Sequence, residues 1–153
     1  MKYAHRLDLT VYSKPEDNEN EIVSGLRRFF PYSLADEKIA IERGIAGSRE
    51  EKKITILRII LEKSSHINKM LSHLCSKIGS EQKDTIFEQI ESRLDRRNDF
   101  FLRFDKHNLA KNNIFSLEDK GDCYHLRISI ASFPKKRENA MEVVRNIFNS
   151  SMH

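Results

Sequence analysis

The chain has 153 residues, of which 39% are hydrophobic and 33% are charged, with 27 Lys and Arg against 23 Asp and Glu. This length is typical of one domain, and the hydrophobic residues suffice for one core. Two cysteines exclude a disulfide framework, the apolar runs are too short to span a membrane, and no secretory signal opens the chain. We therefore expect a cytoplasmic protein without a membrane partner. The pI of about 9.1 permits a nucleic-acid partner without requiring one.

The N-terminal segment of the chain predicts a strand, a helix and two more strands. Apolar and polar residues alternate over residues 7–11, which indicates a half-buried strand. A helix begins near Pro15, with acidic residues in its first turn, and ends at Pro31. Residues 38–41 and 53–61 are typical of strands, separated by a glycine-bearing loop.

The rest of the chain predicts two helices, three strands and a final helix. In order they cover residues 64–78, 80–97, 99–105, 114–117, 123–133, and the segment from Pro134 onward. The order β-α-β-β-α-α-β-β-β-α favours a two-layer α+β domain over residues 1–153, with a mixed or antiparallel sheet of five to six strands and helices on one face.

One face of such a sheet carries no helices, and the parity of each strand indicates its side chains. The expected set is Arg6, Asp8, Thr10, Tyr12, Ile56, Arg58, Ile60, Phe101, Arg103, Asp105, His125, Arg127 and Ser129. Arginine pairs with phosphate and stacks on bases, and aromatic rings stack on bases. The same residues can also form a solvated face in which the arginines pair with Asp8 or Asp105.

Basic residues also gather outside this face. Residues 93–111 hold six Lys and Arg, Lys106 among them, against three Asp. Lys135, Lys136 and Arg137 stand at the start of the last helix, where cations oppose the helix dipole. Arg49, Lys52 and Lys53 occupy the turn between the second and third strands.

These observations predict an RNA-binding surface. Its expected residues are Arg6, Tyr12, Arg49, Lys52, Lys53, Arg58, Phe101, Arg103, Lys106, Arg127, Lys135, Lys136 and Arg137. Within this set we expect Arg58, Arg103 and Arg127 to contact phosphate, and Tyr12 and Phe101 to stack on bases.

Motifs for catalysis or cofactor binding are absent from the sequence. Residues 44–47 match the GxxG spacing of KH domains, but they join two expected strands, so a hairpin turn is the favoured interpretation. His66 and His73 are seven residues apart, which is too far for chelation from one helix face. We expect no enzyme, no cofactor and no metal.

Four segments resemble an archaeal family described as predicted exosome subunits or small RNA-binding proteins. They are HRLDLTV at residues 5–11, the turn and strand at 47–56, RLD at 93–95 and FLRFDK at 101–106. The resemblance covers nearly the whole chain. It implies a fold like that of the ribosomal protein that binds 5S rRNA, and RNA binding in the context of RNA processing or degradation.

An alternative is a protein-interaction module, either a homodimer or an accessory subunit of an RNA-processing complex such as the exosome. Ile56 and Ile60 motivate it, because exposed apolar residues beside arginine and aromatic rings are typical of interfaces. An enzyme acting on a nucleotide is a weaker alternative, since the sequence offers no carboxylate cluster for it.

Overall fold

The computed structural model describes residues 1–47 and 53–149, so Arg49 and Lys52 lie outside the described residues. The strands are β1 (Ala4–Ser13), β2 (Glu42–Ala46), β3 (Ile54–Leu61), β4 (Asp99–Asp105) and β5 (Cys123–Ile130). The helices are α1 (Glu19–Arg27), α2 (Ser64–Lys77), α3 (Ser80–Glu88), α4 (Ile90–Arg93), α5 (Lys106–Asn112) and α6 (Arg137–Phe148).

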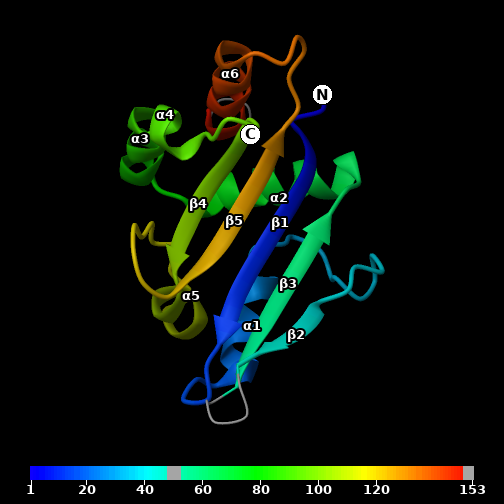
Figure 1. Ribbon diagram of the computed structural model, residues 1–153, viewed down its shortest axis with the longest axis vertical. Coiled ribbons are helices and arrows are strands. Elements are labelled where there is room, and N and C mark those ends of the chain that lie inside the picture. Colours follow the sequence, from blue (N-terminus) through cyan, green and yellow to red (C-terminus); the bar gives the residue numbers. More distant parts are fainter. Residues whose placement is uncertain (48–52, 150–153) are drawn as a thin grey trace.

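The five strands form one antiparallel sheet in the order β2-β3-β1-β5-β4. Helices α1 and α2 lie behind the sheet in Figure 1, and the strands facing the viewer have no helix over them. The predicted α+β class is confirmed, and the order of strands and helices is consistent with the prediction apart from the differences around β4 described below. None of the described helices is both long enough and apolar enough to cross a membrane.

The core lies between the sheet and the helices, and strand parity determines which residues enter it. Leu7, Leu9 and Val11 on β1 are buried, as are Leu57 and Ile59 on β3. Helix α2 places Ile67, Met70, Leu71, Leu74 and Cys75 against them. Burial of each large apolar side chain stabilises the fold by about 1.5–3 kcal/mol, so these residues fix which side of each strand faces the core. The residues between them then point to the opposite face of the sheet.

The second strand lies later in the chain than the sequence predicts. Lys38 has a left-handed backbone with φ of 59°, and the amide of Ile39 donates to the carbonyl of Leu34 at 2.8 Å. Residues 38–41 therefore close a turn instead of pairing with the sheet. Gly44 lies inside β2, opposite Ile56, so the first three residues of the GxxG match belong to a strand and only Gly47 follows it.

The chain around β4 also differs from the prediction. The helix expected over residues 80–97 is divided at Gln89, because Gln89 leaves helical geometry with φ of −106° and ψ of 15°. A short helix that the sequence did not predict, α5, begins where the Asp105 carboxylate caps the amide of Asn108. In the described chain, residues 114–117 form no strand beyond an isolated bridge from Leu117 to Phe104.

The last predicted elements are also shorter than expected. Strand β5 ends at Ile130 and not at residue 133. Helix α6 begins at Arg137, three residues after Pro134, so the intervening segment forms a connection between them.

Candidate nucleic-acid interface

The hydrogen-bonded register places the predicted side chains in rows across the open face. Thr10 on β1 pairs with Arg58 on β3 and with His125 on β5, and His125 pairs with Arg103 on β4. Because paired residues point to the same side of a sheet, these four side chains form one continuous row. Arg103 stands at the β4 end of the row, and beyond Arg58 the row continues to Glu42 on the edge strand β2.

A second row runs parallel to the first. Asp8 on β1 pairs with Ile60 and Arg127, and Arg127 pairs with Phe101 on β4. Arg6 is paired with Ser129 one row further along. The structure therefore brings together on one helix-free face the four arginines, Tyr12 and Phe101 that strand parity predicted.

Three of these four arginines form ion pairs with two buried aspartates, so one of the three positive charges is left in excess. Asp8 accepts hydrogen bonds from Arg6 Nε at 3.0 Å and from an Arg58 Nη at 3.3 Å. Asp99 pairs with an Arg127 Nη at 2.7 Å, and that hydrogen bond raises the pKa of Arg127. For these arginines the alternative of a solvated, ion-paired face describes the structure well. Asp105, the other predicted partner of the arginines, accepts a hydrogen bond from the amide of Asn108 and caps α5 instead.

Arg103 is different. Among the described residues, it is the arginine of this face that takes part in no ion pair. Its positive charge adds to the effect of burial on the neighbouring His125, and both lower the pKa of His125 below the ordinary value of 6.5. His125 is therefore neutral at pH 7, and Arg103 retains an uncompensated charge.

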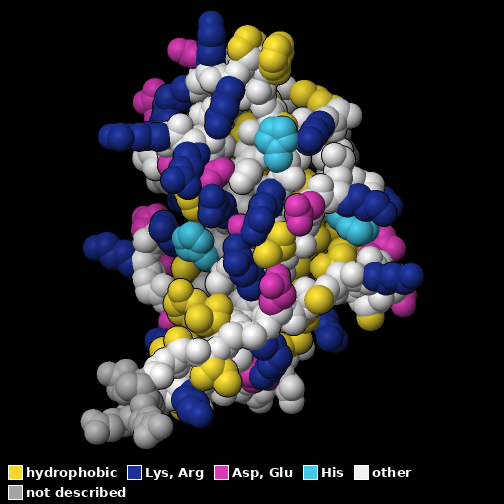
Figure 2. Space-filling view, turned by 45° about the vertical axis from the view of Figure 1, so that its right-hand side comes forward, with side chains coloured by type: hydrophobic (Ala, Val, Ile, Leu, Met, Phe, Trp, Pro, Cys, Tyr) yellow, Lys and Arg dark blue, Asp and Glu magenta, His cyan; other side chains and the backbone are white. Residues whose placement is uncertain are grey.

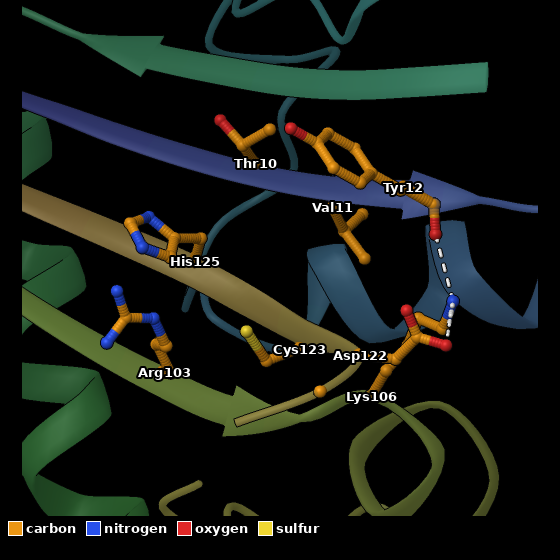
Figure 3. Close-up of a pocket in the computed structure, with 9 residues that line it drawn as sticks. Thr10, Val11, Tyr12, Arg103, Lys106, Asp122, Cys123 and His125 are labelled. Carbon is orange, nitrogen blue, oxygen red and sulfur yellow. Dashed lines mark hydrogen bonds and ion pairs between the residues drawn. The ribbon is translucent and has the colours of Figure 1, made fainter. Parts of the chain in front are cut away.

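Arg103 and His125 line a hollow of about 450 Å³ at one end of the face. Its other lining residues are Thr10, Val11, Tyr12, Lys106, Gly121, Asp122 and Cys123. The Tyr12 side chain is 52% exposed. In Figure 3 the Arg103 guanidinium and the His125 ring lie on β4 and β5 at one end of the hollow, with Thr10 across from His125 on β1. The Tyr12 ring lies at the other end, on β1, with its hydroxyl toward Thr10. A concave site with a few polar groups and an exposed ring is suited to a small planar ligand.

A second hollow, of about 330 Å³, continues along the same face. It shares Thr10 and His125 with the first. The Phe101 ring on β4 lies 5.7 Å from the His125 ring on β5, so this aromatic pair lines the smaller hollow on its β4 side. Together the two hollows extend along the face through the residues that they share.

The structure corrects the prediction that Lys106 contacts RNA. The side chain is only 2% exposed. Its ammonium donates to the Tyr12 carbonyl at 3.1 Å and to the Asp17 carboxylate at 2.8 Å, and it lies 3.5 Å from Asp122. Lys106 therefore holds the end of β1 and the loop before β5 in place, and shapes the hollow from beneath.

The other predicted basic residues lie away from this hollow. Lys53 is exposed beside the β2–β3 connection, whereas Lys135 and Lys136 are exposed beyond the far end of β5, at the opposite end of the molecule in Figure 1. Arg137 donates its guanidinium hydrogens to the carbonyls of Glu91 and Leu94, so this side chain joins α6 to α4.

The sequence did not identify Gly121 and Asp122 as part of the hollow. They belong to the loop before β5. The contact between Asp122 and the Lys106 ammonium brings this loop to the hollow, and no local sequence pattern indicates such a contact. Thr10 belongs to the set that strand parity predicted for the open face. Cys123 shares the parity of His125, so the same reasoning could have included it.

Charge is mixed over this side of the protein. Figure 2 shows Lys and Arg side chains beside Asp and Glu across the middle of the view, with hydrophobic side chains toward the lower end. The described residues contain no group of three or more His, Cys, Asp or Glu that could hold a metal ion. The ligand chemistry that this surface offers is therefore a guanidinium with neighbouring rings.

An antiparallel sheet with helices on one face and arginines and rings on the other places the chain among α+β proteins with an open, ligand-accessible sheet. The chain belongs to the RNA-binding protein family: the family model described as RNA binding matches residues 6–131.

Relatives of this chain span almost its full length. It is 22% identical over 142 residues to the RNA-binding protein PAB1135 of Pyrococcus abyssi, covering 93% of this chain and 92% of the relative. Protein AF2318 from Archaeoglobus fulgidus has a similar fold, with a TM-score of 0.81 and 23% identity over 94% of this chain and 99% of that one. Mth689 from Methanothermobacter thermautotrophicus, a DUF54 protein, has a TM-score of 0.75 and 23% identity, with 95% and 98% covered.

Proposed function

We propose that the chain is a non-catalytic RNA-binding domain that contacts RNA through its open sheet face. The observation that carries the proposal is the unpaired guanidinium of Arg103 beside the rings of His125 and Tyr12. Phosphate is a suitable counterion for a guanidinium, and bases are suitable partners for the rings. Membership of the RNA-binding family supports the choice of ligand.

The predicted residues do not all contribute equally to this proposal. Arg103 contacts phosphate directly. Arg58 and Arg127 are held by Asp8 and Asp99, so they present guanidinium faces and spare donors but little net charge. Arg6 has the same role at a greater distance from the hollow. Lys53, Lys135 and Lys136, with Arg49 and Lys52 outside the described residues, serve longer RNAs that extend beyond the sheet.

The cellular role that we propose is accessory to RNA processing or degradation, in association with the exosome. This aspect of the proposal rests on the resemblance of segments such as 101–106 to the archaeal family, as does the expectation of a fold like that of the 5S rRNA-binding ribosomal protein. A cytoplasmic location fits this role.

The test is the affinity of purified protein for a fluorescein-labelled RNA, compared between wild type and Arg103→Glu. Loss of a charge-assisted contact, worth about 1.5–3 kcal/mol, predicts binding weaker by roughly 10- to 150-fold. Arg103→Glu is more informative than Arg127→Glu, because Arg127 neutralises the buried carboxylate of Asp99 and its reversal also destabilises the fold.

The matched control is Arg145→Glu, an equal change of charge on α6, within the helical layer of the protein. It should leave the affinity within about twofold of wild type, since surface charges away from a contact have little effect. If wild type and Arg103→Glu bound RNA with equal affinity, the sheet face would be excluded as the RNA-binding surface.

A protein-interaction module is the second candidate function. The edge strand β2 is exposed along its whole length, and Ile45 on it is 71% exposed. An open edge of this kind can pair with a strand of another chain, including a second copy. Light scattering over a range of protein concentrations discriminates the two functions. A protein that stays monomeric at every concentration and binds RNA would exclude the homodimer.

A further inference from the structure

The two hollows of the open face bear on whether the RNA is single- or double-stranded, which goes beyond RNA binding in general. A duplex presents phosphates and a shallow minor groove, and its bases are stacked and paired. Its recognition requires cations spaced over a wide surface. The open face instead has four arginines clustered against Asp8 and Asp99, two concave sites and rings that line them.

The spacing of the rings also matters. The rings of this face stand on three strands, Tyr12 on β1, His125 on β5 and Phe101 on β4, and the Phe101 and His125 ring centroids are 5.7 Å apart. Stacked bases are about 3.4 Å apart along one strand of a duplex. Rings arranged in this way therefore match bases that are pulled apart, and bases are free to separate only in a single strand.

We propose that this face binds single-stranded RNA and that the larger hollow holds one unstacked base against Tyr12, with the adjoining phosphate on Arg103. This inference rests on the proposed function and specifies its ligand. The smaller hollow receives the next base of the strand, beside Phe101 and Arg58.

The larger hollow is already formed in the protein without a bound base. The buried ammonium of Lys106 fixes the Tyr12 carbonyl at 3.1 Å, so the end of β1 that carries the ring is held in place. The Asp122 carboxylate, the acid that lines the hollow, is already paired with Lys14 at 2.8 Å and lies 3.5 Å from Lys106. Its negative charge is therefore compensated and does not repel a phosphate on Arg103.

His125 suits a base better than a phosphate. Its imidazole is neutral at pH 7, so it has one hydrogen-bond donor and one acceptor for the edge of a base. The Thr10 hydroxyl, next to it in the same row, has the same dual capacity. The hollow thus offers a stacking ring on one side and adaptable polar groups on its floor.

The test uses fluorescence anisotropy with a labelled eight-nucleotide oligouridine and with an eight-base-pair RNA duplex. We expect the single strand to bind at least tenfold tighter than the duplex. Tyr12→Ala should weaken binding of the single strand by roughly 5- to 150-fold, as loss of one stacked base does, and Tyr12→Phe should restore it. Binding of the duplex should change by less than twofold in both variants.

A matched control is Phe87→Ala, which removes a partly exposed ring from α3, outside both hollows. It should bind the single strand as wild type does. Near-ultraviolet and far-ultraviolet circular dichroism of each variant verifies that the fold is intact.

The outcomes separate this inference from the proposed function. Duplex binding as tight as single-strand binding, together with an unaffected Tyr12→Ala and a weakened Arg103→Glu, would overturn the inference and leave RNA binding at the sheet face standing. Absence of binding to either RNA by wild type would overturn both.

Discussion

At the scale of single residues, a close approach between α1 and the sheet depends on a glycine. Gly25 lies within α1, and a Cβ atom at this position would overlap the hydroxyl of Tyr124 on β5. Tyr124 is fully buried and its hydroxyl donates to the Ile22 carbonyl at 2.8 Å, so the ring has no free direction in which to move. A residue that disfavours helices is therefore required here by packing.

Gly25→Ala should destabilise the protein by about 1–3 kcal/mol. Alanine is the better helix former by about 1 kcal/mol, but overpacking against the fixed Tyr124 ring outweighs that gain. Urea unfolding measures the change. Gly44→Ala is the control, because an added Cβ there would make ordinary contact with Ile56. In a Tyr124→Phe background the loss should be smaller, and an unchanged loss would contradict the role of the hydroxyl.

At the scale of elements, four segments meet at the buried ammonium of Lys106. Lys106 opens α5, Asp17 precedes α1, Asp122 precedes β5, and Lys14 follows β1. The distances are 2.8 Å from Lys106 to Asp17 and 2.8 Å from Lys14 to Asp122. Opposite charges that satisfy one another at this junction hold the loops beneath the larger hollow.

Lys106→Met should cost about 3 kcal/mol at pH 7, because it leaves the Asp17 carboxylate partly buried without its cation. Lys111→Met, an exposed lysine of the same helix, should cost little. Thermal unfolding of both variants tests the expectation. A loss of equal size in both variants would show that the ion pairs of Lys106 contribute nothing specific.

The cost of Lys106→Met should also depend on pH. Burial by itself would raise the pKa of Asp17, but the hydrogen bonds from Lys106 and from the Lys14 amide outweigh it and lower the pKa below 3.8. A carboxyl with a lowered folded pKa stabilises the fold above its unfolded pKa, and that contribution is lost as the pH falls through the folded value. The gap between wild type and variant should therefore be constant from pH 7 to about pH 5 and narrow below about pH 4.

Helices and strands with a regular repeat of apolar residues were predictable from the sequence. Those whose ends depend on a capping side chain or on contacts distant in sequence were not. Alternation placed β1, β3, β4 and β5 within a few residues, since one face of each had to be buried. Helix α5 was missed because its start depends on the Asp105 cap and its burial on α1. The parity of four strands predicted the open face, whereas the ion pairs that neutralise Arg58 and Arg127 depend on the register between strands, which no single segment specifies.

At the scale of the whole molecule, positive charge is spread over distant sites and is not concentrated on one. The net charge is +4, and on the open face Asp8 and Asp99 offset two of the four arginine charges. Lys135 and Lys136 lie beyond the far end of β5, whose eight residues span about 27 Å. A short RNA seated in the larger hollow therefore meets few cations at once.

This distribution predicts a weak dependence of RNA affinity on salt. Each phosphate neutralised on a single strand contributes about −0.7 to the slope of log affinity against log salt, so one to three contacts give a slope between about −0.7 and −2. Titration of eight-nucleotide oligouridine binding from low to high potassium chloride measures it. Arg103→Gln should make the slope shallower by about 0.7, and a double change of Lys135 and Lys136 to Gln should leave it unchanged. A wild-type slope steeper than about −4 would mean that RNA covers a far larger area of the surface than the sheet face.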